Sequence, residues 1–457
     1  MEIEAFGWVL SLEPGEILGP GMFLGLVVAL LSGYPVAFGL GGVAVVFAAV
    51  AMALGVIDAA FLAALPQRIF GIMGNMTLLA IPAFVFMGAM LEQSGIAERL
   101  LETMGRLMGR LRGGLALAVV LVGTVLAATT GVIAATVTTM GLISLPAMLR
   151  AGYDRSLATG VIAASGTLGQ IIPPSIVLVV LGDQLGVPVG QLFLGSMLPG
   201  LLMSGAFALY VVVISLLQPQ LAPPLDTRGK APLTVGALGR VLAAPLGLIL
   251  LVLGSIFFGI ATPTEAGVLG AVGAMALAAS QGGFSRAALR QVSDSTLRTT
   301  AMVMAILIGS TAFSLVFRGV GGDVLISDLL LNLPGGRTGF LAVSMLIIFA
   351  LGFFIDFFEI AFIVLPLLLP SARQLLGPEG LVWLGVVIGA NLQTSFLTPP
   401  FGFALFYLRG VAPPGVSTGD IYRGAIPFVL LQLVVLVLIV VFPQLVTAIL
   451  ALAQGMG

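Results

Sequence analysis

The chain of 457 residues contains no histidine and no cysteine. Without histidine, His-based zinc sites, Ser-His dyads and imidazole proton relays are excluded. Without cysteine, disulfides and thiolate nucleophiles are excluded. Most residue sets that support enzyme chemistry inside a membrane are therefore missing, and we expect no catalytic residues and no enzyme activity.

Charged residues are also scarce, at 8% of the chain against 59% hydrophobic residues. Soluble domains carry about a quarter charged residues, so the composition predicts an all-α polytopic membrane protein surrounded by lipid. The net charge of -1 gives no sign of a nucleic-acid partner. The N-terminal segment carries acids and no basic region, so we do not expect a cleavable signal peptide.

Two polar, proline-containing runs interrupt otherwise apolar segments. They are Ser165–Ser175 (SGTLGQIIPPS) and Asn391–Phe401 (NLQTSFLTPPF). A membrane helix loses backbone hydrogen bonds at such a break, and the freed groups need a ligand, an ion or protein packing. Paired breaks in corresponding positions of two halves are the best sequence indication of a transporter's binding site. Two proline kinks without a ligand are the alternative interpretation.

Residues 113–150 form an apolar segment with small and hydroxyl residues at its centre. The arm before this centre has ~15 residues, or ~22 Å as a helix, which is short for a hydrocarbon core of ~30 Å. Arginines flank both ends, so the positive-inside rule places both ends in the cytoplasm. The segment is therefore predicted to be a re-entrant helical hairpin with its tip at Thr129–Ala135. Two ordinary spans are the alternative.

The second half of the chain repeats landmarks of the first. At an offset of 226 residues, Gly95 falls on Gly321 and Pro173-Pro174 falls on Pro399-Pro400. If the N-terminus is periplasmic and the second half is inverted, most arginines lie on the cytoplasmic side of the membrane, together with the only lysine, Lys230. The predicted domains are a first inverted repeat (1–216; hairpin 113–150, broken helix 156–181), a cytoplasmic linker (217–240) and a second inverted repeat (241–457; hairpin 338–371, broken helix 379–408).

Two acids, Asp356 and Glu359, lie at the predicted tip of the second hairpin. Acids inside a membrane are functional candidates by default; these two are predicted to bind a cation or a proton, with structural pairing as the alternative. Thr262-Pro263-Thr264-Glu265, in contrast, has the pattern of a helix capping box.

The two breaks carry a set of hydroxyl and amide side chains. Their oxygens, with helix-end carbonyls, suit Na⁺, and helix N-termini suit a substrate carboxylate. Hydrogen bonding of each hydroxyl to its own helix is the alternative. The side chains are Ser165, Thr167, Gln170, Ser175, Asn391, Gln393, Thr394, Ser395 and Thr398.

The motifs YPVAFGLGG, LLAIPAFVFMGAM, GTLGQIIPPSIVLV, GIATPTEAG and LTPPFGFALF occur in this order from about residue 20 to 450. They resemble the DctM-like large membrane (permease) subunit of tripartite ATP-independent periplasmic (TRAP) transporters. This resemblance implies the ion-transporter-superfamily elevator fold in the bacterial inner membrane and Na⁺-coupled import of an organic acid. It also implies two partners, a periplasmic substrate-binding protein and a small four-helix membrane subunit, here expected as a separate chain, and no cofactor beyond the coupling ion.

The resemblance also implies where ligands bind. It places ions where each hairpin tip meets its broken helix, which assigns the first ion site to Thr129, Thr130, Gly131, Ser165, Thr167 and Pro173. It assigns the second to Asp356, Glu359, Asn391, Thr394 and Pro399. Substrate-binding residues are expected at Gln170, Gln393, Ser395 and Thr398.

The chain departs from the family pattern at the first tip and first break. Its tip reads ATTGVIAAT where the family often has Gly-x-Ser-Gly-Ser followed by Ala-Asp, so Thr129 and Thr130 are expected to replace some ion ligands. The second hairpin and break resemble the branch associated with 2-oxo acids, mannitol and related substrates, which disfavours sialic acid. The alternatives are a stand-alone carboxylate carrier, H⁺ coupling through Asp356 and Glu359, a channel, and an intramembrane carboxylate enzyme.

Overall fold

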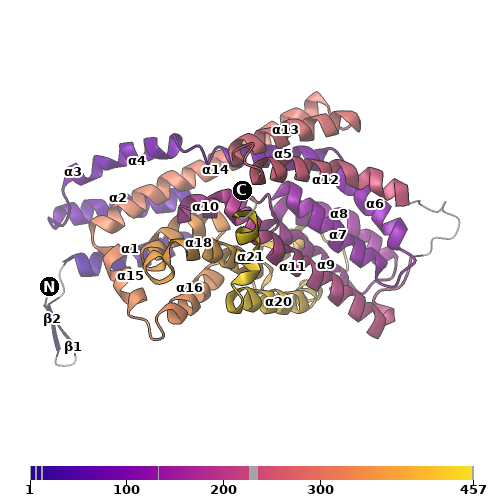
Figure 1. Cartoon of the computed structure of the whole chain (residues 1–457). Helices are drawn as coiled ribbons and strands as arrows, with labels where there is room; N and C mark the ends of the chain where they lie inside the picture. The colour runs from indigo at the N-terminus through magenta and orange to yellow at the C-terminus, as the bar shows by residue number, and fades with distance from the viewer. Residues whose placement is uncertain (1, 6–7, 12–13, 132, 226–234, 455–457) are drawn as a thin grey trace. The chain divides into compact units, whose positions relative to one another are not determined.

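The structure is a computed structural model that describes residues 2–5, 8–11, 14–131, 133–225 and 235–454. Nearly all of this chain is helical (Figure 1). In the described residues, the strands are β1 (Glu2–Ala5) and β2 (Trp8–Ser11), which pair antiparallel. The predicted all-α fold is thus correct except for this short hairpin, which the sequence analysis did not predict.

The chain forms two compact units, and each unit draws on both halves of the sequence. The first unit comprises Met1–Met76, Arg298–Ile347 and Ile355–Leu381. The second unit comprises Thr77–Leu297, Ile348–Phe354 and Val382–Gly457.

The first unit contains the N-terminal hairpin and helices from both ends of the chain. In α1 and α15, Gly19 lies against Gly322, so these helices approach closely. Its elements are α1 (Pro14–Leu31), α2 (Val36–Ala53), α3 (Ala59–Leu62), α4 (Ala64–Met73), most of α14 (Arg286–Gly319), α15 (Gly322–Leu331), most of α16 (Arg337–Leu351), α17 (Phe357–Glu359), the π-helical turn η3 (Ile360–Val364) and the first part of α18 (Leu365–Leu397).

The second unit contains the first predicted hairpin and both predicted helix breaks. Its elements are α5 (Ala80–Gln93), α6 (Ile96–Met108), α7 (Gly114–Thr130), α8 (Ile133–Arg150), α9 (Arg155–Thr167), the 3-10 turn η1 (Leu168–Gln170), α10 (Ile176–Leu185), α11 (Val189–Leu217), η2 (Pro219–Leu221), α12 (Val235–Phe257), α13 (Pro263–Ser280), the start of α14, the second part of α18, α19 (Phe403–Val411), α20 (Thr418–Val441) and α21 (Gln444–Gln454).

In the described residues, six helical segments are long and apolar enough to cross a membrane. The bent pair α5 and α6, which meet at 56°, adds a seventh if it is one span. A polytopic membrane protein is therefore confirmed. The six segments are Val36–Ala53, Ile133–Arg150, Val189–Leu217, Arg286–Gly319, Phe357–Ser395 and Thr418–Val441.

The segment after α11 is fixed to the base of the first hairpin. The amide N–H of Gly113 donates to the Ala222 carbonyl at 3.0 Å, and the N–H of Leu225 donates to the Gly109 carbonyl at 2.7 Å. The N–H of Asp154, after the second arm, donates to the Leu221 carbonyl at 2.9 Å. The start of the predicted linker is thus hydrogen-bonded to the chain at both ends of the hairpin. Helix α12 begins at Val235, inside the predicted linker.

Helices α9 and α20 pack side by side, running in the same direction, through an unusually close backbone contact. Gly160 of α9 lies against the carbonyl of Gly424 in α20, and Gly424 lies against the Ser156 carbonyl. Arg155 Nη1 also donates to the Gly415 carbonyl at 2.7 Å, just before α20 begins. Two helices from opposite halves of the sequence are thereby held in a fixed register.

Gly160→Ala is expected to destabilise the protein, because the new methyl group would overlap the Gly424 carbonyl and force the two backbones apart. Overpacking of this kind costs about 1–3 kcal/mol. Thermal unfolding of the purified protein in detergent measures this effect. Gly205→Ala on α11 is the control, since a methyl group there meets no atom within 4 Å. Equal unfolding temperatures for the two variants would contradict the close contact.

Candidate functional site

The first predicted hairpin is formed by α7 and α8, which contact each other, and Gly131 follows the end of α7 (Figure 1). Gly131 has φ +60°, a left-handed conformation that glycine adopts without steric cost. Thr129 and Thr130 are the last residues of α7, but their side chains, and all of Val132, lie outside the described residues. The predicted tip is therefore correctly located, while re-entry into a membrane stays a prediction.

The first predicted broken helix consists of α9, η1 and α10. Helix α9 begins at an N-cap, where Asp154 Oδ1 accepts a hydrogen bond from the Leu157 amide at 3.0 Å. Residues 171–175 separate η1 from α10 and contain the cis bond Pro173–Pro174. At the end of this turn, the Ser175 hydroxyl donates to the Gln170 carbonyl at 2.8 Å. A side chain thus satisfies one backbone group that the break leaves without a helical partner.

The hairpin tip lies directly against the first break. A methyl group on Gly131 would lie 3.3 Å from the amide nitrogen of Ile176, the first residue of α10. A methyl group on Gly169 of η1 would lie 3.3 Å from the Ala127 carbonyl oxygen in α7. The structure therefore brings the predicted first-site segments, Thr129–Gly131 and Ser165–Pro173, together.

Several polar side chains at the breaks are buried without hydrogen-bond partners. Of the side-chain nitrogen and oxygen atoms in the described residues, nine are buried and unpaired. Five of these belong to predicted site residues: Ser165 Oγ and both amide atoms of Gln170 and of Gln393. These three side chains are fully buried. Buried polar groups in native proteins are normally paired, so these three side chains have hydrogen-bonding capacity that no described residue uses.

The second break separates the end of α18 from α19 and contains the cis bond Pro399–Pro400. Its hydroxyls bond to their own helix: Thr394 to the Ala390 carbonyl at 2.8 Å, and Ser395 to the Leu392 carbonyl at 2.9 Å. Thr398 likewise donates to the Thr394 carbonyl at 2.7 Å. These bonds match the alternative given for the hydroxyls, although each oxygen keeps lone pairs that a cation can use. Asn391 is buried at the same break.

Asp356 and Glu359 form a capping box at the second tip. Asp356 Oδ1 accepts a hydrogen bond from the Phe357 amide at 2.7 Å, and Glu359 Oε2 accepts one from the Asp356 amide at 2.7 Å. Structural pairing, the alternative for these acids, is therefore present, while ion or proton binding stays a prediction. The two acids belong to the first unit and residues 391–399 to the second, so the second ion site also stays a prediction.

The predicted capping box at the start of α13 is confirmed. Thr262 Oγ1 accepts from the Glu265 amide at 3.3 Å, and Glu265 Oε2 accepts from the Thr262 amide at 2.8 Å. A third capping box, Ser417 with Asp420, starts α20. The sequence analysis missed the box at Asp356 although its Asp-x-x-Glu spacing follows the same rule.

The sequence analysis also missed two polar residues that contact the predicted first site or its hairpin. Gln432 of α20 is fully buried, and its Nε2 donates to Thr167 Oγ1 at 3.2 Å. Glu92 of α5 accepts a hydrogen bond from the Thr139 hydroxyl of α8 at 2.6 Å. A lone glutamine in the apolar run FVLLQLVVLV was the available sign of the first contact.

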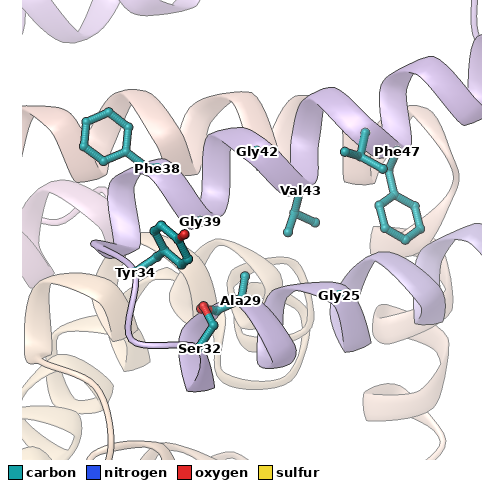
Figure 2. Close-up of a pocket in the computed structure, with 10 residues that line it drawn as sticks. Gly25, Ala29, Ser32, Tyr34, Phe38, Gly39, Gly42, Val43 and Phe47 are labelled. Carbon is teal, nitrogen blue, oxygen red and sulfur yellow. The ribbon is translucent and has the colours of Figure 1, made fainter.

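An open groove of about 390 Å³ lies between α1 and α2 in the first unit (Figure 2). Its lining is apolar apart from Ser32 and Tyr34 near the turn between the helices. The Ser32 hydroxyl already donates to the Ala29 carbonyl at 2.6 Å. The groove therefore offers a charged solute little beyond the Tyr34 hydroxyl, and its apolar lining does not suit such a solute.

Membrane-spanning helices that break at buried polar residues, with a hairpin tip against one break, define the chain as a polytopic membrane transport protein. Residues 23–445 match the family described as tripartite ATP-independent periplasmic transporter, DctM component. The chain belongs to this family and is a TRAP transporter permease subunit, not an enzyme. Family membership implies that it works with a small permease subunit and a periplasmic binding protein.

Three relatives show the range within the family. The C4-dicarboxylate TRAP transporter large permease protein DctM of Vibrio cholerae is 31% identical, over 95% of this chain and 98% of that protein. The sialic acid TRAP transporter large permease protein SiaM of Vibrio cholerae is 28% identical, over 93% and 96%. The isethionate TRAP transporter permease protein DctMQ of Oleidesulfovibrio alaskensis is 29% identical, over 93% of this chain and 65% of that protein.

The fold also resembles a solved structure. The YdaH transporter of Alcanivorax borkumensis superimposes with a TM-score of 0.61 at 17% identity, over 93% of this chain and 98% of that chain. At this identity the likeness concerns the fold alone, and it supports the predicted transporter architecture.

Gly131→Ala is expected to impair transport strongly. The left-handed conformation costs a side chain about 1–2 kcal/mol, and the methyl group would press on the start of α10. We expect initial uptake rates to fall about tenfold or more in reconstituted vesicles, with normal membrane insertion. Gly55→Ala carries the same backbone cost, at φ +72°, with no atom within 4 Å. Equal losses in the two variants would refute a role for the contact between tip and break.

Proposed function

We propose that the chain is the permease subunit of a Na⁺-coupled importer for a small organic acid that a periplasmic binding protein delivers. The acid binds at the two helix breaks, and the hairpins with the broken helices move against the remaining helices in an elevator mechanism. The N-terminus lies on the periplasmic side of the bacterial inner membrane. No cofactor other than the coupling ion takes part.

The observation that carries this proposal is that the amides of Gln170 and Gln393, one at each break and both in the second unit, are buried without hydrogen-bond partners. A side-chain amide offers two N–H donors and one carbonyl acceptor. The carboxylate of an organic acid accepts hydrogen bonds from these N–H donors. A hydroxyl group on the same acid can donate to the amide carbonyl, and an oxo group can accept from a further N–H. An organic acid therefore supplies the partners that these two buried side chains lack.

The named substrates of the relatives agree with an anionic cargo. C4-dicarboxylates and sialic acid carry carboxylates, and isethionate carries a sulfonate. The first hairpin and first broken helix, residues 113–149 and 156–182, contain no charged side chain. Neutral donors and helix termini then hold the anion, as helix N-termini do in other proteins. A 2-oxo acid or a related small carboxylate is the substrate class that we favour.

Na⁺ coupling is supported by the acceptor character of the first break. The Thr167 hydroxyl donates its only hydrogen to the Ala164 carbonyl at 2.8 Å and accepts from Gln432. One lone pair remains, and it suits a hard cation better than an anion. With backbone carbonyls freed at the break, such oxygens form the type of site that binds Na⁺ in broken transporter helices.

Uptake into proteoliposomes tests the proposal. The chain is reconstituted with the small subunit, expected as a separate chain, and labelled 2-oxo acids, C4-dicarboxylates and polyols are offered with and without an inward Na⁺ gradient. Each condition is repeated with and without the binding protein. We expect uptake of one organic acid that needs both the gradient and the binding protein and saturates with substrate.

Other outcomes identify the alternatives. Na⁺-driven uptake that is indifferent to the binding protein would establish a stand-alone carrier. Uptake driven by a pH gradient alone would assign coupling to protons, with Asp356 and Glu359 as the acceptors. Flux that follows only the substrate gradient and does not saturate would establish a channel.

Asp356→Asn separates charge from helix capping at the second tip. Asparagine caps a helix N-terminus about as well as aspartate, so folding should be retained, whereas loss of the carboxylate should reduce ion-dependent uptake by tenfold or more. Uptake at varied Na⁺ concentration measures this loss. Asp154→Asn, at the aspartate N-cap of α9, is the matched control. Normal Na⁺ dependence in Asp356→Asn would show that Asp356 serves only as a cap.

A further inference from the structure

Gln432 is the buried polar group that the predicted site did not include. It lies in α20, in the second half of the chain, and its side chain is fully buried. Its Nε2 donates to Thr167 Oγ1 at 3.2 Å, and its Oε1 is one of the buried atoms without a partner. A buried polar atom left unpaired costs about 1–3 kcal/mol. An apolar side chain would fill the same space without this cost, so packing alone does not explain a glutamine at position 432.

The register of α9 and α20 explains why Gln432 meets Thr167. Gly160 and Gly424 hold the two backbones in contact. Thr167 follows Gly160 by seven residues and Gln432 follows Gly424 by eight. Two turns of an α-helix take ~7.2 residues, so both side chains lie on the faces that the glycines bring together. The contact is built into the packing of the two helices.

The hydrogen bond from Gln432 fixes what Thr167 presents to a ligand. A hydroxyl has one hydrogen and two lone pairs. Because Gln432 occupies one lone pair and the Ala164 carbonyl takes the hydrogen, Thr167 can act only as an acceptor toward a third group. An acceptor binds a cation or a donor, and it repels a carboxylate. The carbonyl of Gln432 has the same acceptor character.

We propose that Gln432 is a positioning residue for a small hard cation at the first break. It holds the Thr167 hydroxyl with a lone pair available to the cation, and it links that site to α20. This inference rests on the proposed function in one respect, that a cation binds at this break. It goes beyond that function because it assigns cation affinity to a residue of another helix, outside both the hairpin and the break.

Cation binding can be measured without transport. Ligands that bind the folded state raise its stability in proportion to the logarithm of their concentration. Thermal unfolding of the full-length chain in detergent, titrated with NaCl at constant ionic strength against choline chloride, gives the Na⁺ concentration for half of the stabilisation. The variants are Gln432→Met, which keeps length without an amide, and Thr167→Val, which keeps shape without a hydroxyl. Gln432→Leu replaces Gln432→Met if the latter does not fold.

We expect Gln432→Met and Thr167→Val each to need about 3–10-fold more Na⁺, the range that the loss of one hydrogen bond gives. The double variant should lose no more than the more affected single variant, because both act through one contact. Thr167→Ser should restore the wild-type value. Val435→Ala, a buried change on the same helix, should lower the unfolding temperature and leave the Na⁺ value unchanged.

Three results would overturn the inference. An unchanged Na⁺ value in Gln432→Met would do so and would leave the proposed organic-acid import intact. If Gln432→Met and Val435→Ala raise the Na⁺ concentration for half-stabilisation equally, the effect of Gln432→Met comes from altered packing and not from the lost amide. If Na⁺ does not stabilise the wild-type protein more than choline does, no Na⁺ binds at the first break. Uptake in proteoliposomes reports separately whether the proposed function survives, since Gln432→Met should raise the Na⁺ requirement with little effect on the substrate KM at saturating Na⁺.

Discussion

A polypeptide inside a bilayer has no water to satisfy its backbone, so every N–H and C=O must find an internal partner. This constraint governs the breaks on which the proposed site depends. At the first break, Ser175 donates to the Gln170 carbonyl and Gly131 lies close to the start of α10. At the second, the Tyr422 hydroxyl donates to the Pro400 carbonyl. Each break is stabilised by local side chains and close packing, while the amides of Gln170 and Gln393 stay buried without partners.

Glycine contacts allow this arrangement to be compact. Where α9 meets α20 and where the first tip meets η1, backbone lies against backbone because no side chain intervenes. Small residues at helix contacts are a recurrent solution in membranes, where apolar surface gives little drive for association. The same contacts set the register that places Gln432 opposite Thr167. Packing and site geometry therefore have a common origin in the positions of a few glycines.

The breaks and the first tip could be predicted because proline, glycine and hydroxyl residues stand out in an apolar sequence. The predicted end of the first hairpin at residue 150 coincides with the end of α8, and the predicted break at Ser165–Ser175 contains the end of α9. Gln432 could not be placed, because the partner of a single glutamine depends on the register of two helices distant in sequence. The capping role of Asp356 was predictable from its spacing to Glu359, but the expectation that buried acids bind ions obscured it. The β1–β2 pairing lacked a turn signal strong enough to stand out.

Electrostatics gives a reason for ions and acid to bind together in the proposed mechanism. Residues 113–149 and 156–182 carry no charge, so a cation bound there alone would leave an uncompensated positive charge in a medium of low dielectric constant. A carboxylate bound alone would leave the opposite charge. Binding of both removes the net charge, and the attraction between them strengthens as water is excluded. At the uncharged first hairpin and first break, the proposed cation and acid would therefore each favour binding of the other, which is what coupled transport requires.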